Sequence, residues 1–451
     1  MTATASGDVA TTALADRTLL DTWNPEDEDL WAAGGRRIAR RNLAFSILSE
    51  HIGFSVWSLW SVLVLFLGPA YHIDAAGKFV LTSLPAAVGS VLRLPYSFAV
   101  TRFGGRNWTV FSALLLLVPC TLAAFVVKPG VSYSTLLILA AVTGVGGGNF
   151  ASSMTNINAF YPDRLKGWAL GLNAGGGNIG VATVQLVGLA VLAWSGKGHP
   201  GLVAGIYLPL IVLAAAGSAI WMDNLPNRQP ERGAIREVAK RGHTWIISTL
   251  YIGTFGSFIG FGFAFGQVLQ VQFKHDFATP IDAAYLTFLG PLLGSLSRPV
   301  GGRLADRFGG AIVSLVTFAA MAAGAGTVLA ASSAKSLPVF VTGFVLLFVF
   351  SGVGNGSVYK MIPVLFAAEP EQKARRLSGA LIGLAGAVGA FGGVLVNMAF
   401  RQSFLSTKSG DAAYLGFLVF YALCGALTWA VYLRRPARAP QAVTAEQAVG
   451  A

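Results

Sequence analysis

The chain has 451 residues, of which 54% are hydrophobic and 12% charged, and its formal net charge is +12. A soluble domain carries roughly twice that charged fraction, so the composition excludes an ordinary soluble enzyme or binding module. Apolar runs of about 20 residues recur between positions 44 and 433, and each can cross a ~30 Å hydrocarbon core as a helix. The alternation of polar and apolar residues that marks membrane β-strands is absent. We therefore expect an all-α integral membrane protein.

Twelve transmembrane helices are predicted along the chain. In order, they are 44–68, 79–101, 108–127, 134–160, 167–195, 202–222, 244–272, 284–302, 311–331, 338–366, 377–400 and 412–433. The longest polar connection, 223–243, divides them into an N-terminal six-helix bundle (44–222) and a C-terminal one (244–433). Residues 1–43 and 434–451 are expected to be tails. The first apolar run starts too late and is too long for a cleavable signal peptide.

The basic residues are distributed unevenly between the two sides of the predicted membrane. Of the 32 Lys and Arg, 22 lie on the side of both tails and of the central linker. The opposite loops carry Lys78, Lys128, Lys197, Lys274, Lys335, Arg401 and Lys408. Under the positive-inside rule both termini are cytoplasmic, in a multi-pass protein of the plasma membrane. Topology thus accounts for the net positive charge, and no nucleic-acid partner is expected.

The two halves repeat each other. Arg102-Phe103-Gly104-Gly105 returns 205 positions later as Arg307-Phe308-Gly309-Gly310, and Arg93 returns at the same offset as Arg298. Gly147-Gly148-Asn149 returns 206 positions later as Val353-Gly354-Asn355. Shared offsets indicate duplicated units that face each other, with a site between them near the midplane of the membrane.

A charged loop follows the eighth predicted helix. Arg303, Asp306 and Arg307 stand among glycines there, in a pattern that resembles the loop signature of the major facilitator superfamily. We interpret them as a cytoplasmic latch, with an ordinary basic loop as the alternative. The corresponding segment of the first half lacks the aspartate.

Arg93 and Arg298 are expected near mid-membrane. Each precedes a cytoplasmic-loop arginine by nine residues, about 13.5 Å along a helix. Burying an arginine there costs about 2.5–3.5 kcal/mol on insertion scales. The only acid clearly inside a span is Glu50, which cannot neutralise both arginines and Lys360. A diffusible anion is expected to complete the balance, while bonding to helix carbonyls is the structural alternative. Two guanidinium groups, planar and always charged, could clamp a small flat oxyanion from both halves.

Other residues around the arginines suit the same role. In the glycine-rich fourth, fifth and tenth helices, Gly147, Asn149, Asn173, Gly354 and Asn355 are candidates. Small residues allow close helix approach, and a buried amide can donate to an oxyanion. Close packing alone is the alternative for most of the glycines.

Aromatic side chains could cover the faces of a flat anion. Tyr251 and Phe255 lie one turn apart on the seventh helix and share a face, and Phe54 lies in the first helix. Such rings would also exclude water from the anion. A place in the core or toward lipid is the alternative for each ring.

Two segments carry a family resemblance. Gly147-Gly148-Asn149-Phe150-Ala151-Ser152-Ser153-Met154-Thr155-Asn156-Ile157 resembles the first signature of the nitrate/nitrite porter family of the major facilitator superfamily. The second signature is similar to Gly354-Asn355-Gly356-Ser357-Val358-Tyr359-Lys360-Met361-Ile362-Pro363. The resemblance implies two pseudo-symmetric bundles, nitrate as cargo and nitrite as second substrate. It also implies that Arg93 and Arg298 bind the anion, with Tyr251, Asn173, Phe54 and Phe255 lining the pocket.

Glu50 and His51 depart from the apolar first helix of many exchangers in that family. Nitrate is the anion of a strong acid, so a proton symporter would need titratable protein groups, and this pair is a plausible carrier. A static polar pair is the alternative. Lys360 could extend toward the cytoplasmic surface or assist release of the anion.

We therefore expect a transporter working by rocker-switch alternating access, with nitrate entering in exchange for nitrite. Proton symport through Glu50 and His51 is the alternative mode. An organophosphate/phosphate antiporter and a non-transporting nutrient sensor are further alternatives. No metal-ligand cluster or nucleophile constellation is visible, so no enzyme activity, metal or cofactor is expected. The protein is expected to act as a monomer.

Overall fold

In the computed structural model of the protein, the described residues are 16, 18–196, 198–226 and 233–434. They form helices, short helical turns and loops, and this described part contains no strand. The expected all-α architecture is therefore what the chain adopts. Residues 1–15 of the N-terminal tail, 227–232 of the linker and 435–451 of the C-terminal tail lie outside the described residues.

The first half of the chain forms six membrane-crossing units, several of them built from consecutive helical segments. Its elements are α2 (Glu28–Leu30), η1 (Trp31–Gly35), α3 (Arg36–Trp57), α4 (Trp60–Phe66), η2 (Pro69–Tyr71), α5 (Ala75–Phe103), α6 (Gly105–Leu115), α7 (Leu117–Val126), α8 (Tyr133–Thr143), η3 (Gly144–Gly148), α9 (Asn149–Phe160), α10 (Asp163–Ser195), α11 (Gly201–Gly205) and α12 (Tyr207–Trp221).

The second half is built in the same way and is joined to the first by a segment that contains α13 (Ala234–Ala239). Its elements are α14 (Gly242–Tyr251), η4 (Ile252–Gly256), α15 (Ser257–Gln272), η5 (Pro280–Ala283), α16 (Ala284–Thr287), α17 (Leu289–Phe308), α18 (Gly310–Ser333), α19 (Leu337–Val364), α20 (Glu371–Thr407), α21 (Asp411–Thr428) and η6 (Trp429–Leu433).

Eleven helical stretches of the described chain are long and apolar enough to cross a membrane. The twelfth predicted crossing, α17, is long enough but much less apolar, because it contains Arg298, Arg303, Asp306 and Arg307. α17 packs along α19 and also along α10 of the first half, and Arg298 is buried there, whereas Arg303, Asp306 and Arg307 are exposed near the end of the helix. Hydropathy alone does not detect α17 because of its charged side chains, and one of these, Arg298, is a predicted site residue.

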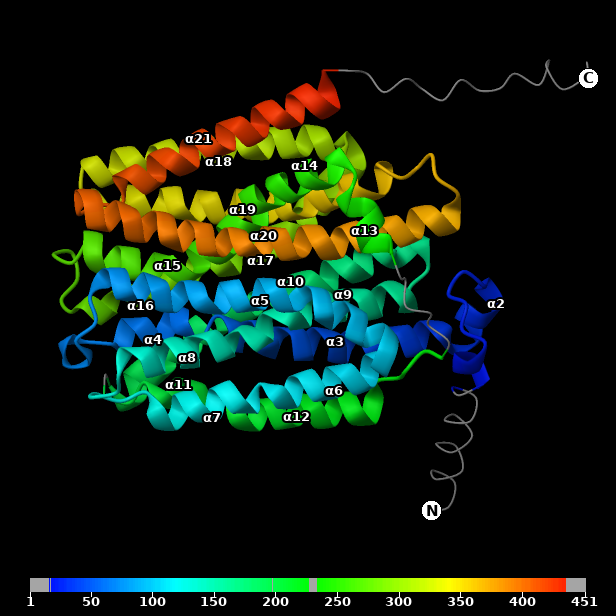
Figure 1. The fold of residues 1–451 in the computed structure, drawn as a ribbon, viewed down its shortest axis with the longest axis horizontal. Helices are drawn as coiled ribbons and strands as arrows, with labels where there is room; N and C mark the ends of the chain where they lie inside the picture. Colours follow the sequence, from blue (N-terminus) through cyan, green and yellow to red (C-terminus); the bar gives the residue numbers. More distant parts are fainter. Residues whose placement is uncertain (1–15, 17, 197, 227–232, 435–451) are drawn as a thin grey trace, which may run out of the picture.

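The two halves lie side by side with their helices roughly parallel to the long axis of the molecule (Figure 1). α5 packs against α20, and α10 packs against α17, so these two pairs form most of the interface between the halves. α2, α13 and the end of η6 all lie at the right-hand end of the bundle in Figure 1. The polar connection between the halves therefore lies at the same end as both described ends of the chain.

Three helices extend well beyond their predicted boundaries. The first begins at Arg36 instead of 44, α17 continues to Phe308 instead of 302, and α20 spans Glu371–Thr407 instead of 377–400. Hydropathy reports the apolar segment, whereas helical hydrogen bonding continues wherever polar side chains find partners. In α3, Arg41 pairs with Asp223 at 2.7 Å, which stabilises the additional turns.

The repeated Arg-Phe-Gly-Gly segments end two equivalent helices in the same way. Gly104 ends α5 with φ +86°, and Gly309 ends α17 with φ +88°. In this region of φ only glycine is comfortable, because other residues would place Cβ against the backbone. The duplicated glycines thus fix the exit angle of the two arginine-bearing helices.

Linker helix α13 packs against α20 through a group of ion pairs. Glu237 of α13 pairs with Arg376 at 2.5 Å, and Arg241 pairs with Glu369 at 2.7 Å. The hydrogen bond from Arg241 holds the pKa of the Glu369 carboxyl below its ordinary value. The end of the linker is therefore held against the second half by charges that persist at neutral pH.

Candidate anion-binding site

Arg93 and Arg298 are buried where the two halves meet. Arg93 lies on α5 and is fully buried, and Arg298 lies on α17 with 3% of its surface exposed. The two helices belong to the two interface pairs described above. The structure therefore places one inaccessible guanidinium from each half at the interface.

Arg93 is held by two backbone carbonyls. Its Nε donates to the Gly147 carbonyl of the first half at 3.2 Å, and its Nη1 donates to the Gly386 carbonyl of α20 at 2.8 Å. The second bond crosses from one half to the other. Nη2 has no hydrogen-bond partner, so two N–H groups of the fork stay available to a ligand.

Arg298 is held by one hydroxyl. Its Nη2 donates to the Tyr251 hydroxyl at 3.2 Å, while Nη1 is buried without a partner. Tyr251 in turn stacks on Tyr359 at 4.4 Å between ring centroids and on Phe255 at 5.2 Å. The second arginine therefore also presents a free end of its guanidinium within an aromatic surrounding.

Two phenyl rings connect the arginines. The guanidinium carbon of Arg93 lies 4.5 Å from the Phe150 ring centre and 4.8 Å from that of Phe255. The corresponding distances for Arg298 are 5.6 and 5.9 Å. Both cations therefore lie over the same pair of rings, one ring from each half.

No carboxylate of the described residues lies within salt-bridge distance of either guanidinium. Glu50 is buried, but its Oε2 accepts hydrogen bonds from Asn173 Nδ2 at 2.7 Å and from the Ser153 hydroxyl. Neither arginine therefore has a salt-bridge partner among the described residues, and the buried carboxyl group of Glu50, a single charge, cannot neutralise both. A buried charge without a partner is costly, and ionisable residues inside the membrane commonly mark functional sites.

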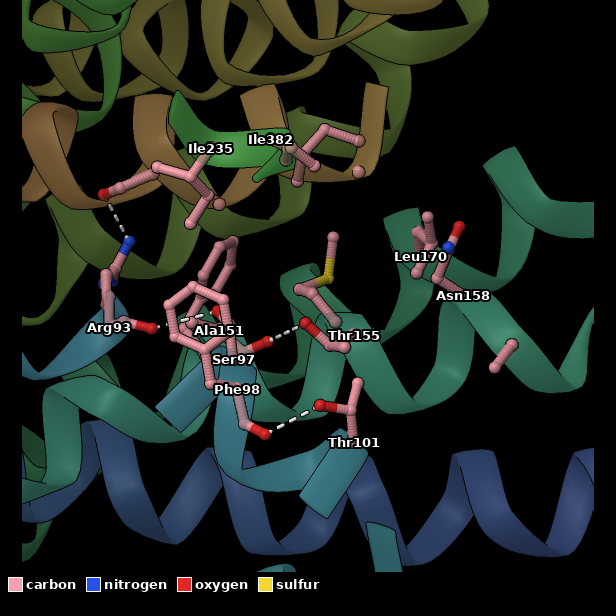
Figure 2. Close-up of a pocket in the computed structure, with 18 of the residues that line it drawn as sticks. Arg93, Ser97, Phe98, Thr101, Ala151, Thr155, Asn158, Leu170, Ile235 and Ile382 are labelled. Atoms are coloured by element: carbon pink, nitrogen blue, oxygen red, sulfur yellow. Dashed lines mark hydrogen bonds between the residues drawn. The ribbon is translucent and has the colours of Figure 1, made fainter. Parts of the chain in front are cut away.

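A cavity of about 430 Å³ leads from Arg93 toward the end of the bundle where α13 lies. It is lined by residues of α5, α9, α10, α13 and α20, and Arg375 lies among them. Figure 2 shows Arg93 at one edge of the group of lining residues, with Ser97, Phe98 and Thr101 after it on α5 and Thr155 of α9 close by. The cavity thus extends between Arg93 and the residues of α13 on the linker side of the protein.

The remaining predicted residues take three different positions. Phe54 is fully buried and contacts the site through the rings of Phe150 and Trp57, with ring centroids 6.0 and 5.2 Å away. The amides of Asn149 and Asn355 are buried without hydrogen-bond partners. Asn149 faces α3, because a Cβ at Gly53 would lie 2.6 Å from its Nδ2. Asn173 is engaged by Glu50, as described above.

The two candidate glycines pack closely against neighbouring helices. A Cβ at Gly147 would lie 2.7 Å from the Trp57 ring, and one at Gly354 would lie 2.3 Å from Thr254. Gly147 also contributes its carbonyl to Arg93. The structure therefore shows the close helix packing that was the alternative role for these two glycines.

Lys360 is not an unpaired cation inside the membrane. Its Nζ lies 2.6 Å from Asp306 Oδ1, and 35% of its side chain is exposed. Of the three residues interpreted as a latch, Asp306 thus pairs with α19, while Arg307 lies over the Phe308 ring at 5.1 Å. Because Lys360 is paired with Asp306, the uncompensated positive charge inside the membrane comes from Arg93 and Arg298.

Glu50 and His51 are not hydrogen-bonded to each other. His51 Nδ1 contacts the Gly176 carbonyl at 3.0 Å, and Glu50 faces α9 and α10. Consecutive helical residues point about 100° apart, so the two side chains occupy separate surroundings. If protons are carried here, the two groups act individually.

The structure adds Phe150, Tyr359, Trp57 and Gly386 to the site residues predicted from the sequence. Phe150 and Tyr359 stand in the two signature segments, and Tyr359 lies one turn after Asn355, so their position was the available signal. The Arg93 guanidinium lies 5.3 Å from the Trp57 ring centre. Nothing in the sequence around Gly386 marks its carbonyl as a partner of Arg93.

The chain is similar to known transport proteins. Residues 45–397 match the Major Facilitator Superfamily. The chain is 36% identical to the nitrate/nitrite transporter NarU of Salmonella typhimurium, over 93% of this chain and 97% of that protein. It is 34% identical to the probable nitrate/nitrite antiporter NarK2 of Thermus thermophilus, over 94% and 99%. It is 27% identical to the nitrite extrusion protein of Bacillus subtilis, over 82% and 89%.

The fold is similar to that of solved sugar transporters. A D-xylose–proton symporter superposes with a TM-score of 0.69 at 15% identity, covering 87% of this chain and 97% of the symporter. The xylose transporter XylE of Escherichia coli gives a TM-score of 0.68 at 14% identity, covering 88% and 99%. At these identities the likeness concerns the fold, and it confirms the expected arrangement of two six-helix bundles.

Proposed function

Because the chain belongs to the Major Facilitator Superfamily, and within it to the NarK-type nitrate/nitrite transporters, we propose that it carries nitrate and nitrite across the membrane by rocker-switch alternating access. It is a multi-pass membrane transporter and not an enzyme. The family resemblance seen in the two signature segments is thereby confirmed.

One observation carries the proposal: two arginines, one from each half, are buried over the same phenyl rings without a carboxylate partner. Each guanidinium keeps an unbonded Nη, and a flat oxyanion between them would accept from both. Rocking of the halves would alter the distance between the arginines, and with it the affinity for the anion. Arg93, Arg298 and Tyr251 would bind the anion, while Phe150 and Phe255 would cover its faces.

Nitrate would enter in exchange for nitrite. Both anions are small, planar and singly charged, so one site can hold either in turn. A relative with similarity over nearly its full length is named a probable nitrate/nitrite antiporter, which supports this mode. Proton symport is the second candidate, because a carboxyl group, Glu50, is buried next to the fifth crossing helix.

A phosphate ester is a less suitable cargo. A bulky dianion would need more cationic partners than two arginines, and the relatives named above are described by nitrate and nitrite. A complete pair of arginines and the cavity that reaches one of them are present in one chain, so a monomer would suffice for transport.

The protein would lie in the plasma membrane with both termini in the cytoplasm. Most basic loop residues lie on the side of the linker and tails, which the positive-inside rule assigns to the cytoplasm. With that orientation the cavity beside Arg93 opens inward.

Transport by the purified full-length protein in proteoliposomes tests the proposal. Nitrate uptake is measured with internal nitrite and no pH gradient, and separately with an imposed inward proton gradient and no internal anion. We expect uptake in the first condition. Uptake in the second condition alone would replace exchange by symport, and no uptake in either would refute nitrate transport.

A further inference from the structure

Glu50 and Asn173 form a hydrogen-bonded pair that is buried inside the first half. Glu50 has 1% of its surface exposed and Asn173 none. Asn173 Nδ2 lies 2.7 Å from Glu50 Oε2 and 2.9 Å from the Ser153 hydroxyl. The two remaining oxygens, Glu50 Oε1 and Asn173 Oδ1, are buried without partners.

This arrangement gives Asn173 the wrong polarity for an anion. Both N–H groups of its amide face Glu50 and Ser153, so the end turned away from them is the carbonyl oxygen. A carbonyl oxygen repels an anion, whereas an amide N–H donates to it. Asn173 can assist anion binding only after its amide turns round.

The pair lies directly behind the wall of the cavity. Asn173 Nδ2 also touches Met154 Sδ at 3.7 Å, and Met154 lines the cavity. The Ser153 hydroxyl lies 3.1 Å from the carbonyl of Phe150, whose ring lies under both arginines. A change of hydrogen bonding at Glu50 therefore occurs next to the residues that surround the anion.

Arg93 on α5 and Arg298 on α17 are the charged groups that act on Glu50 electrostatically. In the described structure Glu50 bonds only to the neutral side chains of α9 and α10. Other titratable groups on the elements packed against α3 form no hydrogen bond with it. These are Arg36, Arg37, Arg40, Arg41 and His51 on α3, Lys78, Tyr96 and Arg102 on α5, Arg106 on α6, Asp163, Arg164 and Lys166 on α10, and Tyr207 on α12.

We propose that a proton on Glu50 reverses the Asn173 amide and thereby turns it into a donor for the bound anion. A proton from water adds to Glu50 Oε2, whose O–H then donates to Asn173 Oδ1. The freed Nδ2 takes the place of that carbonyl and donates toward the anion. Glu50 is in this scheme a positioning residue, and the inference rests on the proposed function.

In this scheme, proton binding to Glu50 and anion binding to the site are thermodynamically linked. If protonated Glu50 favours the anion, the anion must favour protonation of Glu50 by the same factor. Nitrate and nitrite would then each be accompanied by a proton held by the protein. Exchange of one anion for the other would move no net proton, whereas nitrate entry alone would be symport.

Proton uptake on nitrate binding tests the inference directly in the purified full-length protein. Nitrate is titrated calorimetrically in buffers of different ionisation enthalpy, from mildly acidic to mildly alkaline pH. We expect uptake that approaches one proton per nitrate where Glu50 is ionised in the free protein. In that range the affinity should fall about tenfold per pH unit. Nitrate binding without proton uptake at any pH would overturn the inference and leave the transport proposal intact.

Two neighbouring substitutions form a matched pair. Glu50→Gln keeps a donor for Asn173 Oδ1, so it should bind nitrate as the wild type does at the acidic end, without pH dependence or proton uptake. His51→Gln should retain both. A folded Glu50→Gln protein that still takes up protons, or loss of uptake in His51→Gln instead, would refute the role of Glu50.

Asn173→Ala tests the connecting residue. Nitrate should still bind through the arginines, more weakly, and the affinity should no longer depend on pH. Retention of the wild-type pH profile in this variant would show that Asn173 does not transmit the proton. Absence of nitrate binding to the folded wild type at every pH would instead refute the proposed function itself.

Discussion

At the scale of single residues, the two arginines differ in what holds them. Arg93 is bonded to the backbone of both halves, through Gly147 and Gly386. Arg298 depends on a side chain, the Tyr251 hydroxyl. Since the bond from Arg93 to Gly386 crosses the interface, it must break or change whenever α20 moves away from α5. In the proposed function, Arg93 would therefore couple anion binding to the positions of the two halves.

Arg93→Lys should nearly abolish transport. A lysine keeps the charge but cannot donate to Gly147, Gly386 and an anion with one planar fork. Losing a hydrogen bond between charged groups costs about 1.5–3 kcal/mol, so nitrate affinity should fall about ten- to hundredfold. Uptake into proteoliposomes and calorimetric affinity measure this. Arg434→Lys, outside the cavity, is the matched control, and near-normal uptake by Arg93→Lys would contradict the role of Arg93.

Tyr251→Phe should weaken nitrate binding about five- to tenfold, because it removes the hydroxyl that orients Arg298 and costs about 1 kcal/mol or slightly more. The ring remains stacked between Tyr359 and Phe255. Tyr421→Phe removes a comparable buried hydroxyl, bonded to Ser257 at 2.8 Å, at a distance from either arginine's contacts. Equal effects of the two substitutions on nitrate affinity would argue against orientation of Arg298 by Tyr251.

At the scale of elements, the glycines that end α5 and α17 make the two arginine helices equivalent. Gly104 and Gly309 share almost the same positive φ, and each lies eleven residues after its arginine. Their surroundings differ, however. A Cβ at Gly104 would lie 2.3 Å from Asn224 Oδ1, whereas a Cβ at Gly309 would meet no atom within 4 Å.

Substitution of these glycines separates backbone strain from crowding. Gly309→Ala should destabilise the protein by about 1–3 kcal/mol through strain alone, and Gly104→Ala should cost more. Gly302→Ala, inside α17 with open space around its Cβ, should be neutral or stabilise by up to about 1 kcal/mol. Thermal unfolding in detergent measures all three. A Gly309→Ala protein as stable as Gly302→Ala would contradict the strain argument.

At the scale of the whole molecule, the halves make different contacts at the two ends of the bundle. Away from the linker, Gln267 donates to the Ala75 carbonyl at 2.5 Å and Thr82 to Asn397 at 2.7 Å. At the linker end, where the cavity lies, Arg375 of α20 pairs with Asp163 of α10 at 2.7 Å. Arg375 also pairs with Glu26, in the segment that precedes the first crossing, at 3.4 Å. Side-chain hydrogen bonds thus join one end, and partly exposed ion pairs join the other.

Loss of those ion pairs should open the cavity mouth. Each partly exposed ion pair contributes about 0.2–1 kcal/mol. Arg375→Gln removes two such pairs, so the ratio of open to closed cavity mouths should rise about two- to thirtyfold. A cysteine at Ser97, which lines the cavity, would then react faster with a water-soluble maleimide. Arg434→Gln removes a charge that does not line the cavity and should leave the rate unchanged. An unaltered rate in Arg375→Gln would show that these pairs do not control access.

The sequence alone determined the number of crossings, the duplication, the orientation expected from charge and the deficit of acids around Arg93 and Arg298. Hydropathy, residue spacing and charge counts are properties of the chain itself, and insertion into a membrane depends on them one segment at a time. Eleven of the crossings could be found by hydropathy in the described chain, and the twelfth by its duplicated arginine.

The tertiary structure decided which side chains meet between helices distant in sequence. It placed Phe150 under both guanidinium groups, paired Lys360 with Asp306, and turned Asn173 toward Glu50. Each of these contacts depends on the rotation and spacing of two or more packed helices, to within a fraction of a turn. No pattern along one helix contains that information, because a buried side chain finds its partner through the packing of the whole bundle.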